Sequence, residues 1–255
     1  MGGDIYETER LLAEYLLFHY GEPAEILPYA FGPREALGYP ARCVTECLDV
    51  AQLPAVSRAL DIGCAVGRST FELARHCQGV VGIDYSRRFI EAASMLKDRG
   101  ELPYERRDEG ELGTPLIARP PAGVDVSRVA FETGDAQALR SDLGRFDVLL
   151  MANLIDRLAM PYRCLDQLPG LVRPGGQLII TSPYTWLEEF TERDRWLGGR
   201  QTGEERLTTR EGLRRHLSSS FELVGCKDLP FLIREHARKF QWSVAEATLW
   251  RRKAH

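Results

Sequence analysis

A glycine-containing loop with an acid in front of it is the strongest chemical signal in the sequence. The loop runs from Asp61 to Gly67, with Gly63, Cys64 and Ala65 between its ends. Glycine is favoured where the backbone turns at positive φ or lies close against a ligand. Dinucleotide-binding loops have the spacing Gly-x-Gly-x-x-Gly and hold a pyrophosphate, which the carboxylate of Asp61 would repel. The pattern therefore predicts a turn beneath an adenosyl group, with Asp61 attracting an ammonium group.

Two further acids follow later predicted strands. Asp84 ends an apolar segment and can accept hydrogen bonds from both hydroxyls of a ribose. The tripeptide Gly134-Asp135-Ala136 follows the next strand, and a carboxylate there can accept the exocyclic amine of adenine. Each acid alone is typical of a solvated strand end. Taken in order at the carboxyl ends of strands, where ligands of such sheets bind, they predict an adenosine site.

Alternating strands and helices form the frame that must bring these residues together. Strands at 58–62 and 79–83 flank a helix at 69–77, which is the first βαβ unit of a parallel sheet. The alternation continues with a helix at 89–99, strands at 129–132, 146–151 and 177–181, helices at 161–171 and 209–217, and two closing strands within 221–234 and 240–250. We expect an α/β, Rossmann-like fold with a mostly parallel seven-stranded sheet, whose last strand is antiparallel.

The remaining segments are predicted to lie around this sheet as parts of one domain. Residues 1–52 form an N-terminal helical cap, with a helix within the first 20 residues and another at 42–51. Residues 53–255 form the core. Residues 100–125 carry many charges and the pair Pro120-Pro121, so we expect an inserted surface segment.

Composition excludes several other classes of protein. The chain has 255 residues, 44% of them hydrophobic and 27% charged, with a formal net charge of −4. Without a basic stretch, nucleic-acid binding is not favoured. No apolar run reaches the length of a membrane span, and the N-terminus lacks a signal-peptide pattern, so we expect a cytoplasmic protein. The six cysteines are scattered, and we expect no metal site.

The loop from Asp61 to Gly67, Asp84, Asp135 with Ala136, and the Arg173-Pro-Gly-Gly turn resemble the class I methyltransferases. The middle glycine of that family's pattern is Ala65 here, a departure that adds one methyl group. The resemblance implies S-adenosyl-L-methionine as cofactor and S-adenosyl-L-homocysteine as product. The residues implied to bind the cofactor are Arg42, Asp61, Gly63, Cys64, Ala65, Gly67, Asp84, Tyr85, Gly134, Asp135, Ala136, Asn153 and Leu154.

Six further stretches resemble the methyltransferase of ovothiol biosynthesis, which methylates a ring nitrogen of 4-mercaptohistidine (5-thiohistidine). They are 15–21, 39–42, 152–158, 182–191, 196–199 and 230–241. In that family the methyltransferase is often the C-terminal domain of an iron-dependent sulfoxide synthase. The resemblance thus implies a thiol-bearing histidine as substrate and such a synthase acting upstream. The chain is then either a free-standing version or an excised piece.

A zwitterionic imidazole thiol needs particular partners. Its carboxylate needs a guanidinium and its ring an aromatic surface. We expect substrate binding by Tyr39, Arg157, Trp186 and Arg234, and catalysis by Asn153, Tyr184 and Asp156; His19 is a further candidate base. Alternatives are a methyltransferase for another small metabolite, a non-catalytic cofactor-binding protein, and an NAD-dependent oxidoreductase, which would need the absent Gly-x-Gly-x-x-Gly loop.

Overall fold

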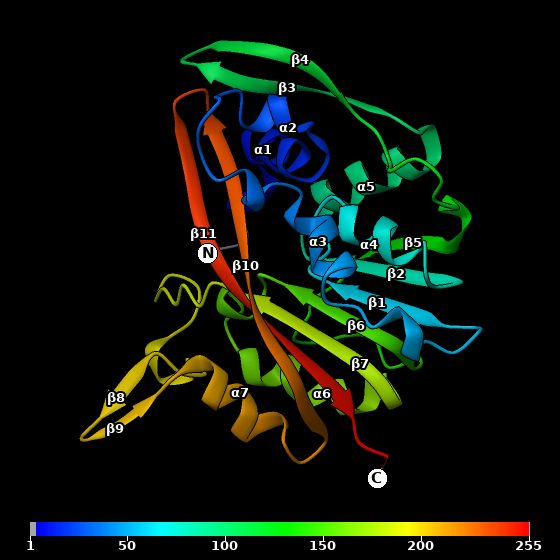
Figure 1. Ribbon diagram of the computed structural model, residues 1–255, viewed down its shortest axis with the longest axis vertical. Coiled ribbons are helices and arrows are strands. Elements are labelled where there is room, and N and C mark those ends of the chain that lie inside the picture. Colours follow the sequence, from blue (N-terminus) through cyan, green and yellow to red (C-terminus); the bar gives the residue numbers. More distant parts are fainter. Residues whose placement is uncertain (1–3, 255) are drawn as a thin grey trace.

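A seven-stranded sheet forms the centre of the protein, whose computed structural model describes residues 4–254 (Figure 1). The strand order is β10-β11-β7-β6-β1-β2-β5. The pairs among β5, β2, β1, β6 and β7 are parallel, whereas β11 is antiparallel to both β7 and β10. The strands are β1 (Arg58–Ile62), β2 (Gly79–Asp84), β5 (Val129–Thr133), β6 (Phe146–Ala152), β7 (Val172–Ser182), β10 (Phe221–His236) and β11 (Lys239–Arg252). This order confirms the predicted Rossmann-like fold.

Helices cover both faces of the sheet, and its central strands are buried on both sides. In β6, Val148 and Leu150 join one apolar cluster while Leu149 and Met151 join the other. Such continuous apolar strands are typical of parallel sheets. The helices after the strands are α4 (Arg68–Leu73), α5 (Arg87–Arg99), α6 (Pro161–Leu171) and α7 (Thr209–Leu217). The predicted helix at 69–77 therefore ends earlier than expected.

The N-terminal segment lies against the sheet and shares its core. It consists of η1 (Asp4–Glu7), α1 (Glu9–Tyr20), α2 (Pro23–Ile26), η2 (Arg34–Ala36), α3 (Tyr39–Thr45) and η3 (Val50–Gln52). Leu16 and Val44 belong to the same apolar cluster as Val148. The helix predicted at 42–51 is present but starts earlier and is shorter, because α3 begins at Tyr39, with Pro40 in its first turn, where proline is tolerated, and ends at Thr45.

Two long hairpins extend beyond the sheet and enclose α1. The segment 100–125, predicted as an inserted surface segment, contains the hairpin of β3 (Leu102–Glu109) and β4 (Leu112–Ala118). β7 pairs with β11 only along Glu246–Arg251, so the rest of the β10–β11 hairpin continues past the sheet. Figure 1 shows α1 and α2 between the tip of this hairpin and β3–β4. A third, small hairpin consists of β8 (Arg200–Thr202) and β9 (Glu205–Leu207).

The described residues contain neither a membrane-spanning helix nor a metal-binding cluster. No helix within 4–254 has the length and apolar character needed to cross a membrane. In the same part of the chain, no three His, Cys, Asp or Glu side chains gather into a group that could hold a metal ion.

Candidate functional site

A cavity of about 430 Å³ lies at the carboxyl ends of β1, β2, β5 and β6, under η1 and α1. Ligands of open α/β sheets bind at this edge, because the loops after the strands converge there. Most of the predicted site residues line this cavity. They are Tyr39, Gly63, Cys64, Ala65, Asp84, Tyr85, Gly134, Asp135, Ala136, Asn153, Leu154 and Arg157.

The glycine loop turns tightly after β1. Gly63, Ala65 and Gly67 all have positive φ, at 76°, 48° and 88°. A Cβ atom on Gly63 would lie 3.0 Å from Cδ1 of Leu154, which also lines the cavity. Glycine is therefore required for both conformation and space at this position. Ala65 departs from the family pattern by more than an added methyl, because its backbone is in the left-handed region.

Asp84 connects the loop to the end of β2. Its two carboxylate oxygens accept hydrogen bonds of 2.9 Å, one from the backbone N–H of Ala65 and one from that of Ser86. Burial raises the pKa of Asp84 to about 6. Each oxygen keeps a further lone pair, so the side chain can still accept the hydroxyls of a ribose.

Asp135 lies in the loop after β5, and this loop forms one end of the cavity. Its Oδ1 accepts hydrogen bonds from the backbone N–H and the side-chain amide of Gln137, at 2.8 and 3.1 Å. Gln137 also lines the cavity, and its Oε1 accepts from the backbone N–H of Met160. These bonds hold the Asp135 carboxylate in place at the position expected for adenine.

Asp61 lies beneath the loop and is fully buried. Its Oδ2 accepts hydrogen bonds of 2.7 Å from the hydroxyls of Ser69 and Thr70, while its Oδ1 has no partner. Burial raises the pKa of Asp61 to about 6. A buried oxygen without a hydrogen bond is unusual and is suited to a ligand N–H. An ammonium group at the end of an adenosyl cofactor fits this requirement, so these residues fit S-adenosylmethionine.

Across the cavity, aromatic side chains and two polar groups form a second region. Asn153 follows β6 with φ at 52°, and its Oδ1 accepts a 2.7 Å hydrogen bond from the hydroxyl of Tyr39. Arg157 donates from Nη1 to the backbone oxygens of Asp156 and Thr185, and its guanidinium lies 4.9 Å from the ring centre of Phe190. A substrate could bind here beside the glycine loop.

Four residues predicted for the substrate or for catalysis do not line the cavity: Tyr184, Trp186, Asp156 and Arg234. Tyr184 donates a 2.7 Å hydrogen bond to Oε2 of Glu246 on β11. Trp186 is buried against Trp196 and donates to the hydroxyl of Thr209. Both were predicted from their aromatic rings and from the resemblance of the stretch 182–191, and packing against the C-terminal elements removes them from the cavity lining. Asp156 is also buried, with Oδ2 accepting from the backbone N–H of Thr185 and from Nη1 of its neighbour Arg157.

Arg42 and Arg234 lie elsewhere as well. Arg42 pairs with Glu46 and donates to the backbone oxygen of Pro230, and it does not line the cavity in which its contact with the cofactor was predicted. Arg234 pairs with Asp108 of the β3–β4 hairpin at 2.8 Å. Like Asp61, Gly67 lies outside the cavity lining: it is the N-cap of α4, and a Cβ there would lie 2.6 Å from the ring of Phe131.

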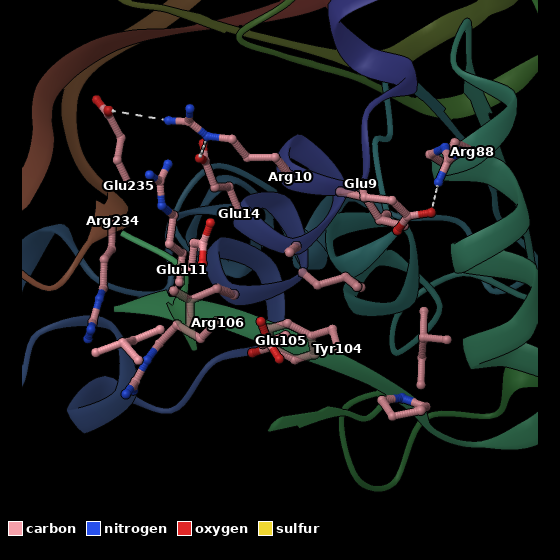
Figure 2. Close-up of a pocket in the computed structure, with 18 of the residues that line it drawn as sticks. Glu9, Arg10, Glu14, Arg88, Tyr104, Glu105, Arg106, Glu111, Arg234 and Glu235 are labelled. Atoms are coloured by element: carbon pink, nitrogen blue, oxygen red, sulfur yellow. Dashed lines mark hydrogen bonds and ion pairs between the residues drawn. The ribbon is translucent and has the colours of Figure 1, made fainter. Parts of the chain in front are cut away.

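Arg234 instead lines a second cavity, of about 660 Å³, between α1 and the β3–β4 hairpin. Figure 2 shows that charged side chains around it pair with one another: Arg10 with Glu14 and Glu235, and Arg88 with Glu9. The opposite face of α1 borders the first cavity. Arg234 is therefore separated from the candidate active site by the helix.

Three residues of α1 line the first cavity and were not predicted as binding residues. Tyr15, Phe18 and His19 are spaced i, i+3 and i+4, so they share one face of the helix. That spacing was visible in the sequence, but it equally fits a helix packed on a core. Tyr6 and Phe190 also line the cavity and carried no comparable signal.

Comparisons with known proteins agree with the fold and the loop. A family model for a methyltransferase domain matches residues 60–180. The ubiquinone biosynthesis O-methyltransferase of Coxiella burnetii (strain RSA 493 / Nine Mile phase I) is 24% identical over 123 residues, which are 48% of this chain and 42% of that protein. The match thus spans less than half the length of this curated relative.

Solved structures of two other proteins share the fold. The [4+2]-cyclase SpnF superposes with a TM-score of 0.59 at 17% identity, covering 98% of this chain and 94% of that one. The N-methyltransferase NodS from Bradyrhizobium japonicum WM9, solved with S-adenosyl-L-homocysteine, gives 0.52 at 17% identity, covering 94% and 98%. The strand order, the loop with its acids and the family match agree with one another: residues 60–180 match a methyltransferase domain, on a Rossmann-like fold whose site fits S-adenosylmethionine.

Proposed function

We propose that the protein transfers the methyl group of S-adenosylmethionine to an imidazole ring nitrogen of 4-mercaptohistidine (5-thiohistidine), the last step of ovothiol A biosynthesis. The observation that carries the proposal is the composition of one cavity. Asn153 and Arg157, from a stretch that resembles the ovothiol enzyme, line the same cavity as Asp84 and Asp135. The N-terminal stretch with the same resemblance contributes Tyr15, Phe18 and His19.

The cofactor supplies the methyl group, its positive charge and the leaving group. The protein then has to align the acceptor nitrogen with the methyl carbon and exclude water. Asn153 is suited to alignment, because the bond from Tyr39 fixes its side-chain oxygen and leaves its amide N–H groups to donate. Those groups could donate to the sulfur or the carboxylate of the acceptor.

Arg157 is suited to the acceptor carboxylate. Its Nη1 is fixed by backbone oxygens on two segments and its guanidinium stacks on Phe190. A guanidinium held in this way can present a planar pair of N–H groups to a carboxylate. The rings of Tyr6 and Phe190, which line the cavity, offer surfaces for an imidazole ring.

General base catalysis contributes less than the positioning of the acceptor in this proposal. His19 is the only histidine among the cavity-lining residues that the structure describes, and burial lowers its pKa to about 3. An imidazole in that environment resists protonation. The neutral ring nitrogen of the acceptor is itself nucleophilic, so positioning carries most of the proposed catalysis. An iron-dependent sulfoxide synthase would supply the thiol-bearing substrate.

Incubation with S-adenosylmethionine and 5-thiohistidine tests the proposal, with mass spectrometry and NMR of the product. We expect one added methyl on a ring nitrogen. A parallel panel contains histidine, a catechol and a mercaptoimidazole without the amino-acid side chain. Preferred methylation of the catechol oxygen would replace the proposal by a small-molecule O-methyltransferase. Cofactor binding without turnover on any member of the panel would favour a non-catalytic binding protein.

A further inference from the structure

One acid in the cavity wall has no partner within the described part of the chain. The acids that line this cavity are Asp84, Asp135 and Glu189. Asp84 and Asp135 already accept hydrogen bonds from backbone N–H groups, and both lie on the cofactor side. Glu189 is exposed and makes no hydrogen bond or ion pair with another described residue. Its carboxylate can therefore bind a ligand in the cavity.

Hydrogen bonds hold Glu189 close to Arg157. The backbone N–H groups of Phe190 and Thr191 donate to one backbone oxygen, which closes a single turn around Glu189. The buried hydroxyl of Thr191 donates a 2.7 Å hydrogen bond to the backbone oxygen of Leu158, the residue after Arg157. The guanidinium of Arg157 lies 4.9 Å from the ring centre of Phe190, the residue after Glu189. The two charged side chains thus come from segments that are fixed to one another.

Arg157 and Glu189 bring one charge of each sign to the cavity without pairing with each other. The ion pair of Arg157 is with Asp156, at 3.2 Å. Since both Arg157 and Glu189 line the cavity, a ligand with one group of each sign can lie between them. An α-amino acid carries an ammonium and a carboxylate on the same carbon and has this property. A catechol has neither charge, and Glu189 would repel a phosphate.

We propose that Glu189 binds the ammonium group of the acceptor while Arg157 binds its carboxylate, so that the site selects a free α-amino acid. This inference deepens the proposed function and rests on it for the identity of the acceptor ring. A histidine inside a peptide has an amide in place of each charged group. It would leave Glu189 and Arg157 without counter-charges, and sites built for polar partners reject ligands that lack them.

Steady-state kinetics with 5-thiohistidine and its N-acetyl derivative tests the role of Glu189. For Glu189→Gln we expect the KM for 5-thiohistidine to rise about fivefold, because the ammonium loses a charged partner that stays in contact with water. The KM for the N-acetyl derivative should be the same in wild type and variant, since this acceptor has no ammonium. The Kd of S-adenosylhomocysteine should also be unchanged.

Glu188→Gln is the matched control. Glu188 is the preceding residue and is exposed as well, but it does not line the cavity. Its variant should keep the wild-type KM for 5-thiohistidine. The carboxamide of 5-thiohistidine gives the reciprocal comparison: its KM should rise in Glu189→Gln and stay level in Arg157→Met, because it keeps the ammonium and lacks the carboxylate. Equal rises for 5-thiohistidine and its N-acetyl derivative in Glu189→Gln, or no rise, would overturn the inference.

Calorimetry separates this inference from the proposed reaction. If the wild-type protein does not methylate 5-thiohistidine, L-histidine and N-acetylhistidine are titrated into its complex with S-adenosylhomocysteine. Tighter binding of L-histidine, with a Kd that rises in Glu189→Gln but not in Glu188→Gln, would support the amino-acid site and remove only the proposed acceptor ring. Equal or absent binding of the two would reject both. Methylation of 5-thiohistidine with an unchanged KM in Glu189→Gln would reject this inference alone.

Discussion

The hydroxyl of Tyr39 donates a 2.7 Å hydrogen bond to Oδ1 of Asn153, across 114 positions of sequence. The same hydroxyl lies 2.7 Å from Oγ1 of Thr181, and the Tyr39 side chain is buried. Asn153 has a left-handed backbone, a conformation that costs free energy and is often retained at functional sites. Tyr39 therefore orients Asn153 and links the N-terminal segment to the end of β6.

Tyr39→Phe should lower turnover with 5-thiohistidine about tenfold, because the Asn153 amide loses its fixed orientation. The free energy of unfolding should fall by about 1 kcal/mol, the usual worth of one hydrogen bond. The Kd of S-adenosylhomocysteine should stay within twofold. Tyr29→Phe is the control, since that hydroxyl bonds to the backbone oxygen of Ala237 away from the cavity. A Tyr39→Phe variant with wild-type turnover would falsify the role of this bond.

Asp61→Asn should stabilise the ligand-free protein while weakening the cofactor complex. Burial raises the pKa of Asp61 from 3.8 to about 6, so folding favours the protonated side chain. The protonated Asp61 side chain makes its full contribution to the stability of the folded protein below pH 3.8. This contribution is lost as the pH rises through 6. At pH 7.5 the folded protein holds a buried charge, and the neutral amide removes that cost.

Thermal and urea unfolding of the Asp61→Asn variant at pH 7.5 should show a gain of about 1–3 kcal/mol. The gain should shrink at pH 4, while the Kd of S-adenosylhomocysteine rises. Asp84→Asn serves for comparison. It should lose stability, because Asp84 accepts two backbone hydrogen bonds on separate oxygens and an amide has only one acceptor. A destabilised Asp61→Asn protein would contradict this account.

The parallel sheet and the cofactor side could be predicted because their signals are local. Each acid follows its own strand, and the strand order brings Asp84 and Asp135 to the same edge without any knowledge of side-chain packing. The β3–β4 hairpin was missed since its first strand is rich in charged residues: one side faces solvent and the other faces α1. The Tyr39–Asn153 bond depends on a contact between distant segments, which periodicity does not report.

The acceptor side was harder to predict for the same reason. Tyr184 and Arg234 have suitable chemistry, but β11 and the β3–β4 hairpin supply other partners for them. His19 has the pattern of a core residue, and only its unpartnered nitrogen in the cavity distinguishes it. Ala65 was read as a small steric change, whereas the structure places it at positive φ.

Arg157→Met should raise the KM for 5-thiohistidine at least tenfold, because the acceptor carboxylate loses a charged hydrogen-bond partner. The KM for a mercaptoimidazole without a carboxylate should change little between wild type and variant. Steady-state kinetics with both acceptors measures the difference. An equal rise for both acceptors would mean that Arg157 supports the fold of the site rather than the carboxylate.

Tyr184→Phe should leave turnover and cofactor binding within twofold of wild type. The hydroxyl bonds to Glu246, which also pairs with Arg210, and none of the three lines the cavity. Loss of the bond should cost about 1 kcal/mol of stability. A drop in turnover beyond tenfold at full folding would return Tyr184 to the list of catalytic candidates.

Cofactor affinity should fall as the pH drops below about 6. In the free protein Asp61 and Asp84 both have a pKa of about 6, and each is needed ionised, one for the ammonium and one for the ribose hydroxyls. One pH unit below that value only about a tenth of each carboxyl is ionised, so the Kd of S-adenosylhomocysteine should rise about tenfold or more by pH 5. His19 does not contribute, because its pKa of about 3 lies below this range.

Asp61→Asn removes one of the two groups, and its affinity profile should therefore be flatter between pH 5 and 7.5. A profile that is level for the wild-type protein would show that neither carboxylate binds the cofactor in its ionised form.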